Sequence, residues 1–311
     1  NGGKASALNL ALQLTDAEVV IAIDADTRLD KQAVFWLARH FEDPAVGAVA
    51  GTVDVGNRQH LITQFQEIEY IVSQNLDRRA LEMANGIVVV PGALGAWRRQ
   101  AVMDVGGYDD DTLAEDADLT LKLQRAGWRI LTEPKALAVT EAPQTTRLFL
   151  RQRFRWMFGM LQVAWKHSSA LKERGAKGVK YIALPNIVLF QFLFALVAPF
   201  VDLLMVSSLA IDAYNYFLST ADGLSSRTQT LMLYWAVWQA LEFAVAALAF
   251  TLDKRNIPSS LLPLLIAQRF CYRQLLYYVA IKTLVAAIRG RLIGWDKLPR
   301  RGIEASRAVT G

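Results

Sequence analysis

Two aspartates, one residue apart, close an apolar stretch of the sequence. In VVIAIDADTRLD, residues 19–30, β-branched and other apolar residues lead directly to Asp24 and Asp26. Carboxylates at the end of a buried strand are well placed to bind a hard divalent cation, which typically bridges phosphate oxygens. A solvated turn in which Asp26 caps a helix gives the same pattern. The pair alone leaves both a metal site and a simple turn open.

A second pair of acids stands in front of a predicted amphipathic helix. In GGYDDDTLAEDADLTLKL, residues 106–123, Glu115 and Asp116 precede the apolar periodicity. Acids favour the first turn of a helix, where backbone N–H groups lack partners. A carboxylate at this position can also act as a general base that takes the proton of an attacking sugar hydroxyl. Helix capping and catalysis both explain the pattern.

A third feature is a basic stripe on the predicted helix at 146–167, TRLFLRQRFRWMFGMLQVAWKH. Arg147, Arg151 and Arg155 recur every four residues, and apolar side chains occupy another face. Such a helix can lie on an anionic membrane surface. Alternatively, Arg155 neutralises a diphosphate leaving group and Trp156 stacks on a sugar. One helix can do both, because its faces differ.

The elements that must position these residues alternate between strands and helices over the first half of the chain. This alternation predicts an α/β domain with a mainly parallel sheet. In such sheets ligands bind beyond the carboxyl ends of the strands. We expect strands at 19–24, 45–55, 86–92 and 128–139, and helices at 31–43, 61–83 and 116–127, with a further helical pattern before the first strand.

Composition limits the class of protein. The chain has 311 residues, 53% of them hydrophobic, and a formal net charge of +5. The single cysteine, Cys271, excludes an intrachain disulfide and a cysteine-based zinc site, and three histidines give little basis for a His-rich metal site. The basic residues gather near the apolar blocks, which indicates a membrane-facing surface and no nucleic-acid partner.

Two apolar blocks in the second half, 182–211 and 231–252, are long enough to span a bilayer, which takes about 20 residues. Asp202 and Glu242 lie inside these blocks. Intramembrane acids usually face a bundle interior or an aqueous path. Solvation near an interface is the alternative, and the sequence leaves both open.

A third block, 258–286, contains Arg269 and Arg273 on one helical face. It is either a third span or a re-entrant or surface-lying hairpin. The distribution of Lys and Arg favours two full spans, with residues 1–180, the loop 253–257 and the C-terminal tail all cytoplasmic. On that basis the third block does not cross completely.

Several motifs together resemble one family. NGGKASALN, DAD, PGALGAWRR, AEDADL and QRFRW occur in the order and approximate spacing found in processive family-2 β-glycosyltransferases, which include cellulose, hyaluronan, chitin and poly-N-acetylglucosamine synthases. The resemblance implies a GT-A type domain on the cytoplasmic face of a bacterial inner membrane. It also implies a nucleotide-sugar donor, a growing polysaccharide acceptor and Mg²⁺ or Mn²⁺.

On the donor side, the resemblance assigns roles residue by residue. Lys4 would approach the nucleotide diphosphate. Asp24 would contact the nucleotide or its ribose together with the metal, and Asp26 would bind the metal directly. Gln152 and Arg155 would hold the nucleotide sugar, with Arg155 near the diphosphate.

On the acceptor side, the resemblance makes Asp116 the catalytic base on the acceptor hydroxyl. Glu115, beside it, would help to bind the substrate. Trp156 would stack on the acceptor sugar at the mouth of a membrane channel. Gly92 and Gly95 would let the backbone approach the acceptor.

The resemblance also suggests how the chain is divided. We expect a catalytic domain at 1–145, an interface helix region at 146–180, transmembrane helices at 181–286 and a basic cytoplasmic tail at 287–311. The family's first nucleotide-binding strand and N-terminal membrane helices have no counterpart here. We therefore expect a fragment of a longer protein that would not bind donor properly by itself.

The sugar is less clearly indicated. The region from EDADL to QRFRW most resembles poly-β-1,6-N-acetylglucosamine synthase-like enzymes, which favours UDP-N-acetylglucosamine over UDP-glucose and UDP-glucuronate. Some such enzymes are fused to deacetylase domains, so a deacetylase domain, export subunits and the lipid bilayer are candidate partners. Two alternatives are a non-processive transferase that adds one sugar to a lipid carrier and a membrane scaffold with an inactive transferase domain.

Overall fold

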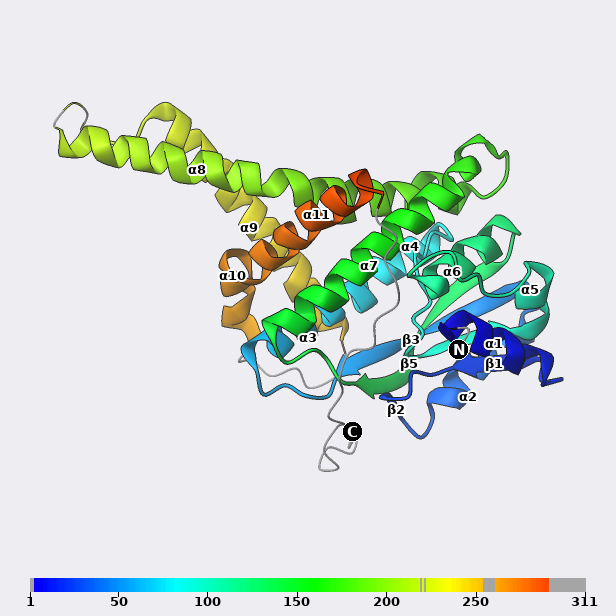
Figure 1. The fold of residues 1–311 in the computed structure, drawn as a ribbon. Coiled ribbons are helices and arrows are strands. Elements are labelled where there is room, and N and C mark those ends of the chain that lie inside the picture. Colours follow the sequence, from blue (N-terminus) through cyan, green and yellow to red (C-terminus); the bar gives the residue numbers. More distant parts are fainter. Residues whose placement is uncertain (1–2, 219, 221, 254–260, 291–311) are drawn as a thin grey trace.

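The computed structural model describes residues 3–218, 220, 222–253 and 261–290 of the chain. A mixed helix and strand region continues to residue 140, and the elements described beyond it are helices (Figure 1). The strands are β1 (Val19–Ala22), β2 (Arg28–Leu29), β3 (Val46–Val55), β4 (Gly95–Arg98) and β5 (Arg129–Thr140).

Helices surround this sheet and then extend away from it (Figure 1). In the first region they are α1 (Gly3–Gln13), α2 (Ala33–Ala38), the 3₁₀ helix η1 (Arg39–Glu42), α3 (Leu61–Val72), the π-helical turn η2 (Ser73–Asp77), α4 (Arg78–Met83), α5 (Arg99–Asp104) and α6 (Glu115–Arg125). Beyond it they are α7 (Thr146–Lys166), the 3₁₀ helix η3 (His167–Lys172), the π-helical segments η4 (Val179–Ala183) and η5 (Asn186–Leu193), α8 (Phe194–Phe217), α9 (Ser226–Leu252), α10 (Leu262–Phe270) and α11 (Tyr272–Ile288).

The sheet is mixed, so the prediction of a mainly parallel sheet was wrong. Among the described residues its strand order is β1-β4-β3-β5-β2, and β3 and β5 form its parallel pair. Strand β4 runs antiparallel to both of its neighbours, with Ala96 opposite Ile21 on one side and Val49 on the other. The difference arises because β4 enters between β1 and β3 in the reverse direction, a long-range pairing that local periodicity does not reveal.

The prediction of a strand at 86–92 was also wrong. The strand in this part of the chain is β4, at Gly95–Arg98. The apolar segment lies against α6, and two side chains of that helix bind backbone groups of the segment. Thr120 Oγ1 accepts from the backbone N–H of Val90 at 3.0 Å, and Gln124 Nε2 donates to the carbonyl of Ile87 at 3.0 Å. Side-chain partners thus replace the ladder bonds that a buried strand would need.

The long helix predicted at 61–83 is present but contains the π-helical turn η2. This turn directs Gln74 at the sheet, where its side-chain amide accepts from Val53 N at 2.6 Å and donates to Val53 O at 2.8 Å. Strand β4 pairs with β3 only along residues 48–50, so this stretch of β3 is open to a side-chain partner. Gln74 therefore anchors the helix to the sheet.

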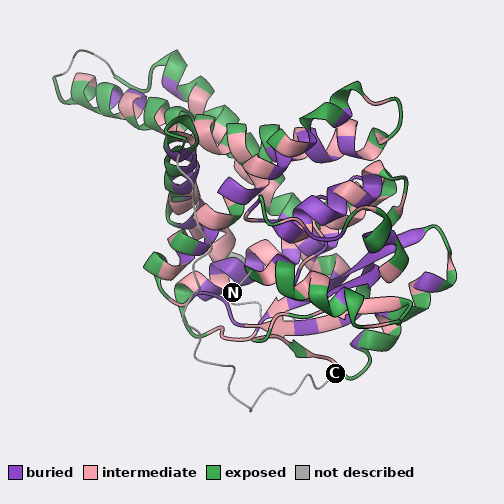
Figure 2. Ribbon diagram, turned by 45° about the vertical axis from the view of Figure 1, so that its right-hand side comes forward, coloured by how far each residue is buried: buried purple, intermediate pink, exposed green. Residues whose placement is uncertain are grey.

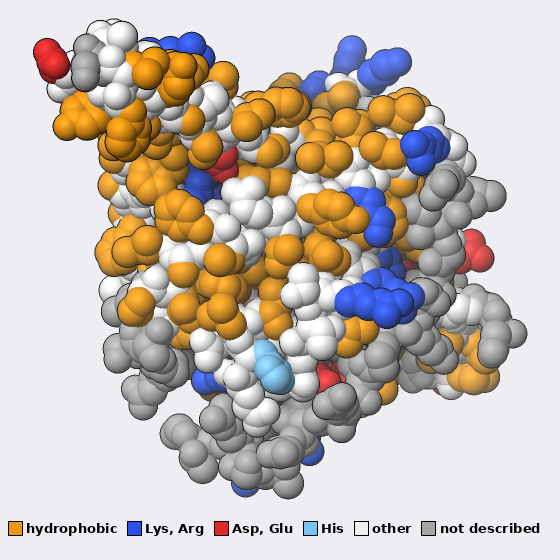
Figure 3. Space-filling view, turned by 60° about the vertical axis from the view of Figure 1, so that its left-hand side comes forward, with side chains coloured by type: hydrophobic (Ala, Val, Ile, Leu, Met, Phe, Trp, Pro, Cys, Tyr) orange, Lys and Arg blue, Asp and Glu red, His pale blue; other side chains and the backbone are white. Residues whose placement is uncertain are grey.

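Helices α8 and α9 project from the body of the molecule, and their surfaces are largely exposed (Figures 1 and 2). Within the described residues, two helical stretches are long and apolar enough to cross a membrane, Val179–Phe217 and Ser226–Leu252. Hydrophobic side chains gather over this end of the molecule, with Lys and Arg nearby (Figure 3). The two predicted apolar blocks thus lie in helices that are long enough for a span, and their crossing of a membrane stays a prediction.

The third apolar block is a helix broken at Cys271 into α10 and α11. Its arginines pair with Asp202 and Glu242, the two acids whose surroundings the sequence left open. Arg269 forms an ion pair with Asp202 of α8, and Arg273 Nη1 lies 2.5 Å from Glu242 Oε1 of α9. Both acids thus face protein cations. The 17 residues of α11 span about 26 Å, less than the ~30 Å hydrocarbon core. The loop 254–257 and most of the tail lie outside the described residues.

A substitution at Gly178 tests how the chain before the apolar helices packs against the sheet domain. A Cβ atom at Gly178 would lie 2.1 Å from the carbonyl oxygen of Asn85 and 2.4 Å from that of Ala84. We expect Gly178→Ala to lower the free energy of unfolding by about 1–3 kcal/mol, because backbone atoms must move apart. Gly175→Ala is the matched control, since a Cβ there meets no non-neighbouring atom within 4 Å. Equal thermal unfolding midpoints for the two variants would contradict the close contact.

Candidate active site

One cavity connects the predicted site residues with the apolar helices. Its volume is about 2000 Å³, and its walls come from the loop after β1, the N-terminus of α6, and helices α3, α7, α8, α9 and α11. All predicted site residues except Gly95 line it: Lys4, Asp24, Asp26, Gly92, Glu115, Asp116, Gln152, Arg155 and Trp156. The fold therefore brings separate stretches of sequence to one space.

The ammonium group of Lys4 lies among the carboxylates of this cavity. Lys4 Nζ is 3.1 Å from Asp24 Oδ1 and 3.0 Å from Glu115 Oε1. Burial lowers the pKa of Lys4, but the charges of Glu115 and Asp24 outweigh burial and raise the pKa above its ordinary value. A Cβ at Gly92 would lie 2.5 Å from Lys4 Nζ, so a glycine leaves room for the ammonium group. Lys4 links the loop after β1 to the N-terminus of α6.

Asp116 lies in the first turn of α6 and is half-buried. Its Oδ2 accepts from Gly92 N at 3.1 Å, and its Oδ1 accepts from Ala117 N at 2.9 Å. Burial raises the pKa of Asp116 to about 6, and the charge of Glu115 acts in the same direction. Lys4 and the two N–H groups oppose this rise. The pKa of Asp116 is thus closer to neutral pH than that of an ordinary aspartate, which suits a general base.

Asp24 and Asp26 lie in the loop that follows β1, as the sequence predicted. Asp24 contacts Lys4, and Thr140 Oγ1 at the end of β5 lies 3.5 Å from Asp26 Oδ1. Both aspartates offer carboxylate oxygens to the same cavity. Such hard oxygen donors suit Mg²⁺ or Mn²⁺, so the residues present fit a divalent metal.

Helix α7 presents Gln152, Arg155 and Trp156 to the cavity. Gln152 is 4% exposed, and its Oε1 has no hydrogen-bond partner within the described part of the chain. An unpaired buried acceptor is costly, so this atom suits a ligand that donates an N–H or O–H group. Trp156 is 37% exposed and offers an aromatic surface.

Gly95 lies apart from these residues, inside strand β4. A Cβ at Gly95 would lie 2.7 Å from Val90 Cγ1 and 3.1 Å from the carbonyl oxygen of Pro91. Close packing of the segment before β4 explains the glycine. The predicted acceptor role of Gly95 has no support in its position, whereas Gly92 lies beside Asp116 in the cavity.

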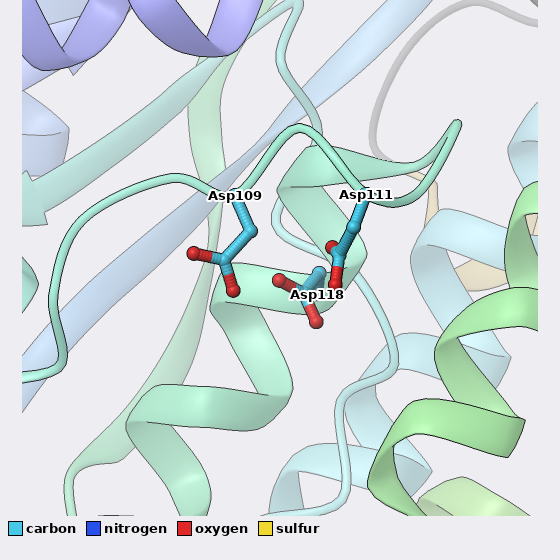
Figure 4. Close-up of side chains that lie close together, drawn as sticks. All are labelled: Asp109, Asp111 and Asp118. Atoms are coloured by element: carbon cyan, nitrogen blue, oxygen red, sulfur yellow. The ribbon is translucent and has the colours of Figure 1, made fainter.

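A second acidic cluster lies at the other side of α6, where Asp109, Asp111 and Asp118 converge (Figure 4). Their carboxylate oxygens lie within 4.8 Å of one another, a spacing that suits a divalent cation. However, Lys166 Nζ at the end of α7 lies 2.6 Å from Asp109, 2.7 Å from Asp111 and 3.0 Å from Asp118. Lys122 also contacts Asp109, at 2.8 Å, so two ammonium groups offset the acidic charge, and the cluster joins α6 to α7.

Sequence reasoning missed three cavity residues, Glu69, Arg153 and Tyr272. Arg153 is the arginine of QRFRW that lies outside the stripe with a period of four. It is only three residues before Trp156 and four after the apolar Phe149, which places it on their face of the helix. This spacing is the sequence feature that indicates a cavity position for Arg153. Its partners, Glu69 and Tyr272, lie in other helices, and no such feature of the sequence indicates them.

The structure has the GT-A-like fold of glycosyltransferases. It is similar to the solved mannosyltransferase PcManGT from Pyrobaculum calidifontis, in complex with GDP-Man and Mn²⁺, with a TM-score of 0.54. The match covers 86% of this chain and 67% of that chain at 21% sequence identity. This similarity concerns the fold.

The amino-acid sequence identifies the family to which the chain belongs. The model of Glycosyl transferase family group 2 matches residues 19–252, so the chain belongs to this family, as its motifs predicted. It is 33% identical over 160 residues to the poly-beta-1,6-N-acetyl-D-glucosamine synthase of Staphylococcus aureus, covering 51% of this chain and 39% of that protein. It is 27% identical over 304 residues to the probable glycosyltransferase YdaM of Bacillus subtilis, covering 96% of this chain and 70% of YdaM.

Lys166 gives a test of the second acidic cluster. We expect Lys166→Met to lower the free energy of unfolding by about 1–3 kcal/mol, because Asp118, whose side chain is 1% exposed, loses a charged partner. Lys172→Met is the matched control, since Lys172 is exposed. Chemical unfolding with and without Mg²⁺ measures both variants. Unchanged stability of Lys166→Met would contradict this role, and restoration by Mg²⁺ would show that the three carboxylates bind a cation once the lysine is removed.

Proposed function

We propose that the chain is the catalytic core of a membrane-embedded, inverting, processive glycosyltransferase that transfers N-acetylglucosamine from UDP-N-acetylglucosamine to a growing β-linked polysaccharide. One observation carries this proposal. The acidic loop after β1, the half-buried Asp116 and the Gln152–Trp156 segment face a single cavity that continues between the apolar helices. A donor site, a base and a path for a long product thus adjoin one another.

On the donor side, Asp24 and Asp26 would hold Mg²⁺ or Mn²⁺, which when bound neutralises charge on the diphosphate. Lys4 and Arg155 supply further positive charge to the same cavity. Positive charge placed at the leaving group lowers the barrier to its departure. Gln152 would contact the donor sugar through its unpaired oxygen.

On the acceptor side, Asp116 would take the proton of the acceptor hydroxyl as that oxygen attacks the anomeric carbon. The bond to the diphosphate breaks in the same displacement, which inverts the anomeric configuration. An α-linked donor then gives a β-linkage. Glu115 would help to bind the substrate, and Trp156 would stack on the acceptor sugar.

The apolar helices support a membrane location. We place the catalytic domain at 1–145 on the cytoplasmic face of the inner membrane, the interface helix region at 146–180, membrane helices within 181–286 and a cytoplasmic tail at 287–311. Two long helices with exposed apolar side chains support this arrangement. In water, these exposed apolar side chains would have no apolar partner to cover them. A deacetylase domain or export subunits would act on the product.

The donor is supported by similarity to the staphylococcal synthase, of which this chain spans 39%. UDP-glucose and UDP-glucuronate are the competing donors. UDP release by the full-length protein in membranes, measured with each donor and Mg²⁺ or Mn²⁺, separates them. Product length on a gel separates a processive enzyme from one that adds a single sugar to a lipid carrier. No UDP release with any donor would favour a scaffold with an inactive domain.

The role of Asp116 predicts that Asp116→Asn lowers the rate of UDP release by about 10²–10⁴-fold while donor binding is retained, because the base is lost and the side-chain shape is kept. Asp110→Asn is the matched control, an exposed aspartate six residues earlier. Turnover and donor affinity are measured separately. Near-normal turnover in Asp116→Asn would remove Asp116 from the mechanism.

The raised pKa of Asp116 predicts a pH dependence. The base is active when deprotonated, so kcat/KM for UDP release should rise with pH and level off above a midpoint near 6. Because the folded-state pKa lies above the ordinary value of 3.8, ionisation of Asp116 also costs stability as the pH rises from about 4 to 6. A pH–rate profile at low donor concentration checks the first expectation. A flat profile between pH 5 and 7 would contradict it.

A further inference from the structure

A buried arginine lies beside the proposed acceptor platform. The side chain of Arg153 is 6% exposed, whereas Arg151 on the same helix is exposed. Arg153 Nη1 lies 3.0 Å from Glu69 Oε1 of α3, and Arg153 Nη2 donates to Tyr272 Oη of α11 at 3.3 Å. The Tyr272 hydroxyl donates in turn to Glu69. The three side chains close a triangle of polar contacts between α3, α7 and α11.

The guanidinium group of Arg153 also contacts an aromatic ring of the cavity. Its Cζ lies 4.4 Å from the centroid of the Trp156 ring, a cation–π contact between residues three apart on one helix. Trp156 lines the cavity and is 37% exposed. The guanidinium group thus contacts the indole, while Trp156 keeps exposed surface on which a sugar ring could stack.

Tyr272 is held in place by packing as well as by its hydroxyl. It is 0% exposed, and its ring centroid lies 5.4 Å from that of Phe65 and 5.0 Å from that of Phe149. The start of α11 is therefore fixed between α3 and α7. Removal of the hydroxyl alone leaves these aromatic contacts, so Tyr272→Phe separates hydrogen bonding from packing.

We propose that Arg153 is a positioning residue, fixed by Glu69 and Tyr272, that holds the Trp156 indole in the orientation in which the acceptor sugar stacks on it. This proposal rests on the proposed function, since it takes a sugar to be the ligand of Trp156. It gives the third apolar block a function, because α11 then sets the geometry of the acceptor subsite without contacting the reacting atoms. A loose guanidinium group would let the indole rotate and weaken acceptor binding.

The test uses the full-length protein in membranes, with UDP-N-acetylglucosamine as donor and a soluble β-1,6-linked N-acetylglucosamine pentamer as acceptor. We expect Tyr272→Phe to raise the acceptor KM for UDP release about three- to tenfold, because one hydrogen bond to Arg153 is lost. The donor KM should stay unchanged. Glu69→Gln, which keeps the shape of the side chain, should act in the same direction. Tyr278→Phe is the matched control, since Tyr278 lies on α11 and is 54% exposed.

A double-mutant cycle distinguishes positioning from a general loss of structure. In a Trp156→Ala background, Tyr272→Phe should raise the acceptor KM no further, because the indole that it positions is gone. A full additional increase in that background would overturn the proposal. An unchanged acceptor KM in both Tyr272→Phe and Glu69→Gln, with normal UDP release by the wild type, would overturn the positioning role alone. Absence of UDP release by the wild type would instead overturn the proposed function.

Discussion

The site depends on the positive charge of Lys4. Carboxylates of Asp24, Glu115 and Asp116 share one cavity, and like charges in a partly dry space repel one another strongly. Lys4 contacts Asp24 and Glu115 directly and opposes the rise of the Asp116 pKa. Burial and the charge of Glu115 raise the pKa of Asp116, and the charge of Lys4 limits that rise. The ammonium group thus joins the loop after β1 to the N-terminus of α6 and favours the ionised form of Asp116.

Local sequence predicted the residues of the site better than the sheet that carries it. Asp24 follows an apolar run and Asp116 begins a periodic helix, so short-range patterns were enough to place both. Segment 86–92 reads as a strand, but Thr120 and Gln124 of α6 supply its partners, and such partners thirty or more residues away leave no local mark. The reversed direction of β4 was hidden for the same reason, since strand order depends on pairing across the whole domain.

Helix α7 connects the cavity with the second acidic cluster, because different faces of the helix make different contacts. One face presents Gln152 and Trp156 to the cavity, and Lys166 at its end closes the acidic cluster beside α6. The sequence showed an arginine stripe and an apolar face, but the buried Arg153 became intelligible only with its partners in α3 and α11. The same holds for Asp202, whose cation lies 67 residues further along the chain. Charge pairs between distant helices are the part of this fold that sequence periodicity cannot predict.

The triangle of Glu69, Arg153 and Tyr272 also sets an order of events during biosynthesis. Glu69 and Tyr272 are 203 residues apart, and both long apolar helices lie between them. At about 5–20 residues per second, translation separates the two partners by roughly 10–40 s. In the later part of that interval, once residue 156 has been made, the nascent chain contains the carboxylates of the site and the arginine beside Trp156, but it lacks the tyrosine that completes the triangle. The proposed acceptor platform would therefore be the last part of the site to mature, and a ribosome-bound chain that ends within α9 would contain Asp116 and Trp156 without the completed triangle.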